Sequence, residues 1–256
     1  MKDVEAVFRL PVWMSFGAGL ATLILASFLH PRLMGPGPGS GAQAGESTAA
    51  ASAGWRAAAH LFGGFRPLAI DVLWIRADAL FRQGRLWELA ALFRGIVALD
   101  PRNAAVREFA AWHLAYNVAL AEPGPDQRFE WFLRGMEILG APPGDKPRDA
   151  AARVLGARMM VDRFGSGVFP GFAEKVGTLY GAPPLETAAG WLEEAADDPG
   201  TSPAAYVVLL FCTGRLELEA EEADDPRGAR LWGERKSRAL SRATARFPQE
   251  DWTAWR

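Results

Sequence analysis

Three charged side chains lie within one eight-residue stretch whose spacing could bring them onto a common helix surface. Asp71 and Asp78 are seven residues apart, close to two helical turns, so both carboxylates fall on the same face. Arg76 lies between them and can reach the neighbouring turns. The two carboxylates could contact a bound ligand, or they could form ion pairs within the helix or with a neighbour. Asp71, Arg76 and Asp78 are therefore candidates for partner binding.

Motifs for catalysis or cofactor binding are missing from the sequence. Three histidines, His30, His60 and His113, are scattered, and none has a second ligand at a metal-binding spacing. No dinucleotide-binding fingerprint, P-loop or nucleophile elbow occurs. The single cysteine, Cys212, stands in an apolar run without a nearby histidine, which predicts a small buried residue rather than a nucleophile. We therefore expect a non-catalytic protein without metal or cofactor.

Charge is unevenly distributed, although the net charge is only −2. Eleven acidic residues and one basic residue lie in the range 186–225, whereas eight basic and three acidic residues lie in 227–256. We expect two solvated helix faces that partly pair with each other, with a charged docking surface as the alternative. The acidic pairs Glu193-Glu194 and Asp197-Asp198 are expected on the solvated surface. The balance gives no global electrostatic argument for nucleic-acid binding.

Ten tryptophans are many for a chain of 256 residues. Five of them fall on helical patterns where the core is the default location, and these are Trp74, Trp87, Trp112, Trp131 and Trp191. The C-terminal stretch 247–256 contains Trp252 and Trp255. It could cap the last helix, or it could contact a partner or a membrane surface. Trp252 and Trp255 are therefore further candidates for partner binding.

Helices must position these side chains, because Ala, Leu, Arg and Glu dominate the composition. In residues 68–83, Val72, Leu73, Ala77 and Leu80 form one apolar stripe at helical spacing. Gly84 is placed for a helix C-cap, and a second amphipathic pattern follows over residues 86–99 until Pro101 ends it. So short a turn predicts two antiparallel helices whose apolar stripes are in contact.

The stretch 80–103, LFRQGRLWELAALFRGIVALDPRN, resembles the second half of a tetratricopeptide repeat. The matching elements are the Gln83-Gly84 turn, Glu88, Phe93 and the closing 99–101. It departs from that motif at Leu89 and Ile96, where the motif prefers alanine. Residues 63–117 also resemble uncharacterised bacterial membrane-anchored proteins with degenerate repeats of this class. The resemblance implies an all-α solenoid of antiparallel helix pairs whose groove holds a protein or peptide.

Three further helix pairs are expected along the rest of the chain. They span residues 103–140, 149–196 and 203–248, and the second of these is interrupted at 165–171. Thr201 and Ser202 precede Pro203 as a helix start. Together with the first pair they predict one tetratricopeptide-like repeat domain over residues 55–256.

Residues 10–29 contain no charged side chain and are long enough to cross the hydrocarbon core of about 30 Å. They predict a single transmembrane helix, 10–30, after a short segment, 1–9. Because Lys2 and Arg9 precede the span, we expect the C-terminal body outside the cytoplasm, with the anchor in the inner membrane. Small pairs four residues apart could pack against another membrane helix, and these are Ser15/Gly19 and Gly17/Ala21. Residues 31–54 are rich in Gly, Pro, Ala and Ser and predict a flexible linker.

These features predict a membrane-anchored, non-catalytic scaffold or accessory subunit of a bacterial envelope complex, such as a transporter, secretion or assembly machine. Its expected partner is a protein or peptide, with no nucleic acid. One alternative is a secreted soluble binding protein, if residues 1–44 are removed as a signal segment. Another is a hydrolase that uses Asp or Glu residues on a helical solenoid.

Overall fold

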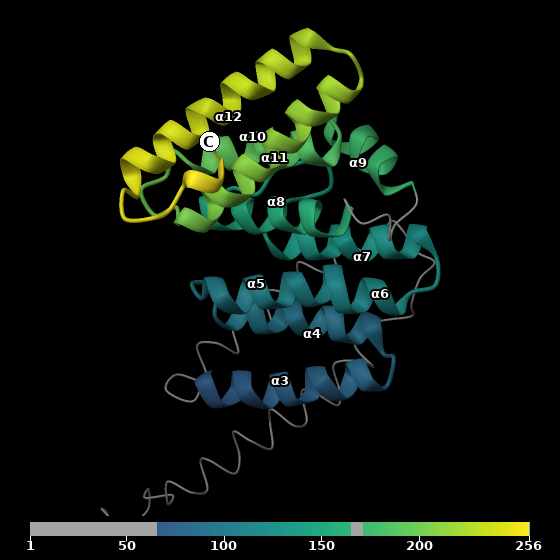
Figure 1. The fold of residues 1–256 in the computed structure, drawn as a ribbon. Coiled ribbons are helices and arrows are strands. Elements are labelled where there is room, and N and C mark those ends of the chain that lie inside the picture. Colours follow the sequence, from purple (N-terminus) through teal and green to yellow (C-terminus); the bar gives the residue numbers. More distant parts are fainter. Residues whose placement is uncertain (1–65, 165–170, 256) are drawn as a thin grey trace, which may run out of the picture. The chain divides into compact units, whose positions relative to one another are not determined.

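A computed structural model describes residues 66–164 and 171–255, and within these ranges the chain is helical and contains no β-strand (Figure 1). The prediction of an all-α protein is confirmed for this part of the chain. The chain divides into two compact units, residues 1–101 and residues 102–256. The described helices of the first unit are α3 and α4, and those of the second unit run from α5 to η3.

The predicted anchor, 10–30, the linker, 31–54, and the packing candidates Ser15, Gly17, Gly19 and Ala21 lie outside the described residues. Among the helices that are described, none combines the length and the apolar character needed to cross a bilayer.

In the first unit, α3 (Arg66–Arg82) and α4 (Leu86–Leu99) pack together as a hairpin, as the sequence predicts. The turn between them needs glycine, because Gly84 has a φ of +68°, a conformation that side-chain-bearing residues rarely adopt. Leu73, Ala77 and Leu80 are buried as expected, whereas Val72 is only half-buried. Phe93 is also buried, and its ring centroid lies 5.3 Å from that of Trp74.

The second unit begins with one continuous helical run of three segments, α5 (Ala104–His113), the π-helical η2 (Leu114–Val118) and α6 (Ala119–Ala121). It packs on α7 (Pro125–Ile138), which confirms the pair predicted for 103–140. The helices approach closely because Gly135 has no side chain. A Cβ atom there would lie 2.7 Å from the carbonyl oxygen of Ala111.

The region predicted as a third pair, 149–196, forms three helices rather than two. These are α8 (Ala150–Phe164), α9 (Phe172–Tyr180) and α10 (Pro184–Ala195), and α8 packs on α10. The extra helix is anchored by Phe172, whose ring meets Phe129 and Phe132 of α7 edge-on at 5.0 and 5.1 Å. The sequence prediction was wrong here because a nine-residue helix adds only two turns of periodic pattern.

The last pair, α11 (Pro203–Glu222) and α12 (Pro226–Arg246), is confirmed, and α12 forms the outer layer of the second unit in Figure 1. Ion pairs join the basic helix α12 to acidic residues of α10, the turn after it and α11, as the charge distribution predicts. They are Glu193–Arg235, Asp197–Arg242 and Glu217–Lys236. Glu193 is half-buried, so the prediction that it is solvated is wrong. A short helix, η3 (Thr253–Trp255), follows α12.

The tryptophans divide between core and surface. Trp131 and Trp191 are buried, as predicted, and Trp74 is half-buried. The core prediction is wrong for Trp87 and Trp112, whose residues are 43% and 39% exposed. Helical periodicity places an aromatic residue on an apolar face, but whether a neighbouring helix covers that face depends on the tertiary structure.

Candidate functional site

A groove in the second unit lies between α5 and α8, the first helices of two successive pairs. Two polar contacts join these elements. Arg107 Nη2 lies 3.1 Å from Asp149 Oδ2 just before α8 begins, and Tyr116 Oη donates a hydrogen bond to Asp162 Oδ2 at 3.3 Å further along. Because residue numbers increase in the same direction on both sides of these contacts, α5 and α8 run parallel. The groove lies between the two contacts.

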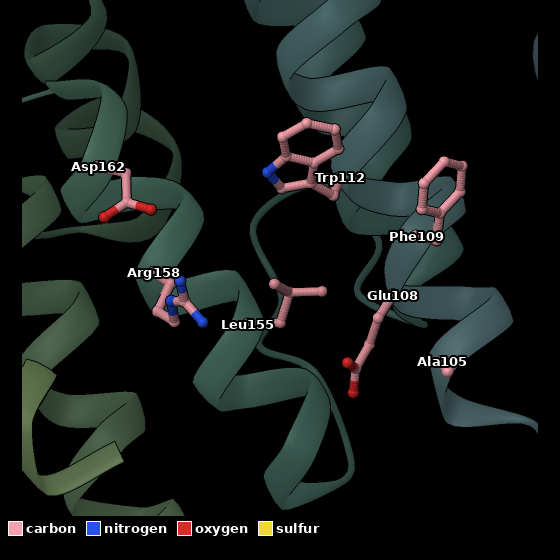
Figure 2. A pocket seen from close by; sticks show the side chains of 7 residues that line it. All are labelled: Ala105, Glu108, Phe109, Trp112, Leu155, Arg158 and Asp162. Carbon is pink, nitrogen blue, oxygen red and sulfur yellow. The ribbon is translucent and has the colours of Figure 1, made fainter. Parts of the chain in front are cut away.

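The groove has a volume of about 260 Å³ and is lined by side chains from both helices (Figure 2). Its lining consists of Ala105, Glu108, Phe109 and Trp112 from α5, and Leu155, Arg158 and Asp162 from α8. Phe109 is 50% exposed and Trp112 is 39% exposed, so two large aromatic residues face solvent at one place. Figure 2 shows the Trp112 indole on the side of its helix nearest Leu155.

α5 exposes these aromatic side chains because the continuous helical run is apolar on two faces. One face is buried against neighbouring helices through Ala110, Ala111, Leu114, Ala115 and Val118. The other face carries Ala105, Phe109 and Trp112 at spacings of four and three residues, one stripe of a helix. A surface helix needs only one apolar face to join a core, so the second stripe requires another explanation.

Tyr116 stacks against the indole ring of Trp112. The two rings stack with centroids 5.2 Å apart and an interplanar angle of 21°, and Tyr116 is buried. Tyr116 lies in the π-helical segment η2, whose wider turn changes the direction of the side chains that follow it. The π-helix, the ring stack and the hydrogen bond to Asp162 together fix one wall of the groove.

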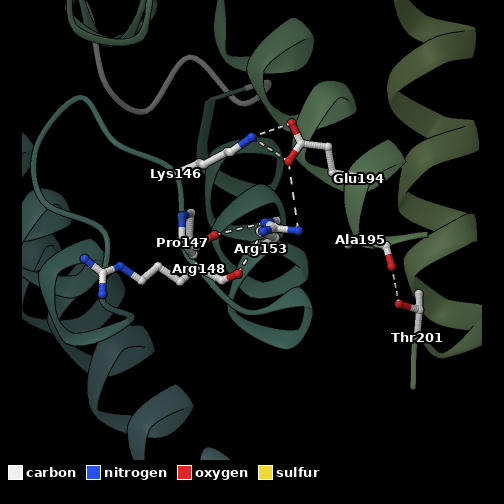
Figure 3. Close-up of polar contacts among 7 residues, drawn as sticks. All are labelled: Lys146, Pro147, Arg148, Arg153, Glu194, Ala195 and Thr201. Carbon is white, nitrogen blue, oxygen red and sulfur yellow. Dashed lines mark hydrogen bonds and ion pairs between the residues drawn. The ribbon is translucent and has the colours of Figure 1, made fainter. Parts of the chain in front are cut away.

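The opposite wall, α8, is positioned by the loop that precedes it (Figure 3). Arg153 donates hydrogen bonds from Nε to the carbonyl oxygen of Pro147 at 2.9 Å and from Nη2 to that of Arg148 at 2.8 Å. Lys146 pairs with Glu194 of α10 at 2.6 Å. The Asp149 carboxylate accepts a hydrogen bond from the Ala152 backbone N–H at 2.8 Å and so caps α8. The loop therefore ties the start of α8 to α10.

The groove contains charged side chains that make no ion pair within the described part of the chain. This holds for Glu108, which is half-buried, and for Arg158, which is exposed. The Asp162 carboxylate accepts the hydrogen bond from Tyr116. Elsewhere in the second unit many charged groups at similar exposure are paired, as Glu193 is with Arg235. The groove thus combines exposed aromatic surface with unpaired charge.

The charged candidates Asp71, Arg76 and Asp78 lie on α3 in the first unit and do not line the groove. Asp78 pairs with Arg82 at 2.7 Å within α3, the local pairing that was the alternative to ligand contact. Asp71 is exposed and Arg76 is half-buried. Asp71 and Asp78 both face solvent, as their seven-residue spacing predicts, but nothing in the described first unit joins them into a dyad.

The C-terminal candidates are largely used in packing. Trp252 is 5% exposed, and its indole Nε1 donates a hydrogen bond to the carbonyl oxygen of Phe247 at 3.1 Å. Trp255 is half-buried in η3. This is the helix-capping arrangement that the sequence left open. It leaves little of the Trp252 ring for a partner.

Sequence patterns do not identify the residues of the groove. Phe109, Glu108 and Arg158 belong to no recognisable motif, and helical periodicity predicts Trp112 in the core. One signal was available, because the stripe Ala105, Phe109 and Trp112 lies beside a second stripe rich in alanine. The contribution of α8 gives no such signal, since Leu155 and Asp162 are ordinary surface residues of an amphipathic helix.

Metal and thiol chemistry receive no support within the described ranges. Residues 66–164 and 171–255 contain no group of three or more His, Cys, Asp or Glu side chains able to hold a metal ion. Cys212 is fully buried, as predicted, and this burial raises the pKa of its thiol to about 12. A thiol with so high a pKa is almost entirely protonated at neutral pH and is a poor nucleophile.

Neither the known family models, nor curated proteins, nor solved structures match this chain. The groove's own geometry therefore carries the functional argument.

Proposed function

We propose that this protein is a membrane-anchored, tetratricopeptide-like scaffold or accessory subunit of a bacterial envelope complex. In this role the groove between α5 and α8 holds a segment of a partner protein. In this proposal, residues 10–30 anchor the chain in the inner membrane with the helical body outside the cytoplasm, and residues 31–54 tether that body.

The observation that carries the proposal is the pair of exposed aromatic side chains, Phe109 and Trp112, in a groove with fixed walls. Exposed apolar surface that is concave and rimmed by charge is typical of interaction sites. Aromatic residues supply much of the binding free energy at such sites because they bury a large area at a low cost in side-chain entropy.

The size of the groove favours a protein segment over a small molecule. Pockets for small ligands usually measure roughly 300–1,000 Å³ and enclose most of the ligand. The α5–α8 groove, at about 260 Å³, is smaller than this. It suits one or two side chains of a longer segment that also contacts the surrounding surface.

The mechanism has two physical parts. Phe109, Trp112 and Leu155 remove the apolar side chains of the partner from water, while the two polar contacts between α5 and α8 hold the walls of the groove together before binding. The anchor and the tether confine the groove near the membrane. A tether with the composition of residues 31–54 would keep the groove close to partners in the same membrane and so raise its local concentration.

The test is co-purification from the native bacterium after gentle detergent extraction. The variant Phe109→Ala/Trp112→Ala removes the groove aromatics. The matched control, Val207→Ala/Phe211→Ala, removes apolar residues of similar exposure, 42% and 47%, from α11. We expect the first variant to lose a specific co-purifying protein that the wild type and the control retain. Equal recovery with all three chains would refute the assignment of partner binding to this groove.

A further inference from the structure

Within the proposed function of the groove, we propose that the partner segment carries a lysine or arginine. Its side chain lies along Trp112 and its charged end pairs with Glu108. This inference rests on the groove being the binding site, and it specifies which chemistry the groove recognises.

The first step concerns the carboxylate of Glu108. It lies on α5, four residues before Trp112, so both side chains share one face of the helix, and both line the groove. Glu108 has no ion pair with any residue in the described part of the chain. Figure 2 shows its side chain extending from α5 beside Leu155.

The second step is the charge balance of the opposite wall. Arg158 and Asp162 are four residues apart on α8, so their opposite charges lie on one helix face. With Glu108 included, the lining carries two carboxylates and one guanidinium, a formal charge of −1. This net negative charge favours a cation over an anion as the bound group.

The third step is the accessible surface of Trp112. Tyr116 stacks against the indole, and the residue remains 39% exposed on the groove side. The face of an indole ring attracts a cation, and the methylene groups of lysine or arginine cover apolar surface while the charged end stays near water. Trp112 and Glu108 therefore offer complementary contacts to the two parts of one basic side chain.

This protein already uses the same arrangement within its own fold. The guanidinium carbon of Arg235 lies 4.1 Å from the centroid of Trp232, while its nitrogens bind both carboxylate oxygens of Glu193 at 2.7 Å. In that cluster a tryptophan and a glutamate hold a cation together. The groove contains a tryptophan and a glutamate, and within the described residues no cation is paired with that glutamate.

A second cluster repeats the pattern on a single helix. On α7, Arg134 lies 5.5 Å from the centroid of Trp131 and donates a hydrogen bond to Glu130 at 2.8 Å. The basic residue follows its glutamate by four positions. On α5 the corresponding position, four residues after Glu108, is Trp112 itself, so no residue of the helix supplies the cation.

The experiment uses the full chain in detergent micelles and an immobilised library of synthetic ten-residue peptides. Each peptide has a fixed central leucine. A single lysine, arginine, glutamine or glutamate is placed at each of the remaining positions, one position per peptide. We expect selection of peptides with lysine or arginine near the leucine. Fluorescence anisotropy of the best peptide then gives its affinity for the variants.

Three substitutions make the charge argument quantitative. Glu108→Gln is expected to weaken the basic peptide about threefold to tenfold, because it removes the carboxylate and leaves the indole. Arg158→Gln leaves the affinity unchanged or raises it, since a repelling charge is lost. Glu108→Lys should prefer the same peptide with its basic residue replaced by glutamate. Glu221→Gln, which removes an exposed carboxylate at the end of α11, is the control without effect.

The outcomes separate this inference from the proposed function. Selection of acidic peptides, with Arg158→Gln weakening them, overturns the basic-residue assignment and leaves groove binding intact. Binding without any charge preference also overturns the basic-residue assignment and leaves groove binding intact. If no peptide binds, and Phe109→Ala/Trp112→Ala also co-purifies the same proteins as the wild type, the proposed function itself fails.

Discussion

Tyr116 donates its phenolic hydrogen to Asp162 across a distance of 3.3 Å, joining positions that are 46 residues apart in the sequence. The same phenol ring supports the indole of Trp112 at 5.2 Å. Tyr116 thus contributes one of the two polar contacts between these elements and also stacks against the exposed aromatic residue of the groove. Groove geometry and groove chemistry are coupled through this contact.

Tyr116→Phe separates these two roles, because it keeps the ring and removes the hydroxyl. We expect the free energy of unfolding to fall by about 0.5–1.5 kcal/mol, together with weaker binding in the groove. The matched control is Tyr206→Phe, which removes a similar bond, from Tyr206 Oη to the carbonyl oxygen of Ala196 at 3.2 Å. Chemical unfolding followed by circular dichroism, combined with co-purification, checks both effects. A control that loses partner binding to the same degree would remove the special role of Tyr116.

Gly135 tests the close approach of α7 to α5. A methyl group there would lie 2.7 Å from a backbone oxygen and 3.1 Å from the Ala115 Cβ, and neither can move without shifting a helix. Gly135→Ala should therefore destabilise the protein by about 1–3 kcal/mol, despite the higher helix propensity of alanine. Gly190→Ala, in α10, meets no atom within 4 Å and should stabilise it by about 0.5–1 kcal/mol. Equal effects in unfolding experiments would contradict the packing described.

Much of the architecture follows from local sequence rules. Gly84, with its positive φ, and prolines at the starts of α7, α10, α11 and α12 give clear helix boundaries. These signals are local, because a proline or a left-handed glycine restricts the chain wherever it is folded. The burial of Cys212 and the pairing of acidic residues with α12 also follow from pattern and charge.

The groove was harder to predict because its parts come from helices that are distant in the sequence. Trp112 looks like a core residue until the position of α8 is known. Glu108 and Arg158 look like ordinary solvated charges in the sequence. Only the structure shows that they line one groove and that neither makes an ion pair within the described residues. The π-helical segment that contains Tyr116 also gives no periodic signal, since η2 is five residues long and lies inside a longer helix.

The pair formed by Glu193 and Arg235 tests the attachment of α12. Both side chains are partly shielded, and the bond is bidentate at 2.7 Å, so it is stronger than a pair in open solvent. Glu193→Gln should lower the free energy of unfolding by about 1–2 kcal/mol. Glu219→Gln breaks the exposed pair with Arg215 and should change the free energy of unfolding by less than about 0.5 kcal/mol. Similar losses in the two variants would argue against a role for shielding.

The raised pKa of the Cys212 thiol should make the stability of the fold depend on pH in alkaline solution. Burial disfavours the thiolate and raises the pKa of this thiol from its ordinary value of 9.0 to about 12 in the folded chain. Between these values the unfolded chain releases a proton that the folded chain keeps. The contribution to stability is thus complete below pH 9 and is lost as the pH rises toward 12. Unfolding measured from about pH 8 to pH 11 should show a smaller decline in Cys212→Ala than in the wild type. Parallel declines would contradict this prediction.

The central claim is that a partner protein occupies the groove at Trp112. The most direct measurement replaces Trp112 with a photo-crosslinking phenylalanine analogue in the cells that naturally produce the protein and identifies the covalent adduct by mass spectrometry. The same analogue at Phe211, an exposed position on α11, is the comparison. We predict one dominant partner adduct at position 112 that is absent at position 211 and is reduced by Glu108→Lys. No adduct at 112, or the same adducts at both positions, would contradict the proposal.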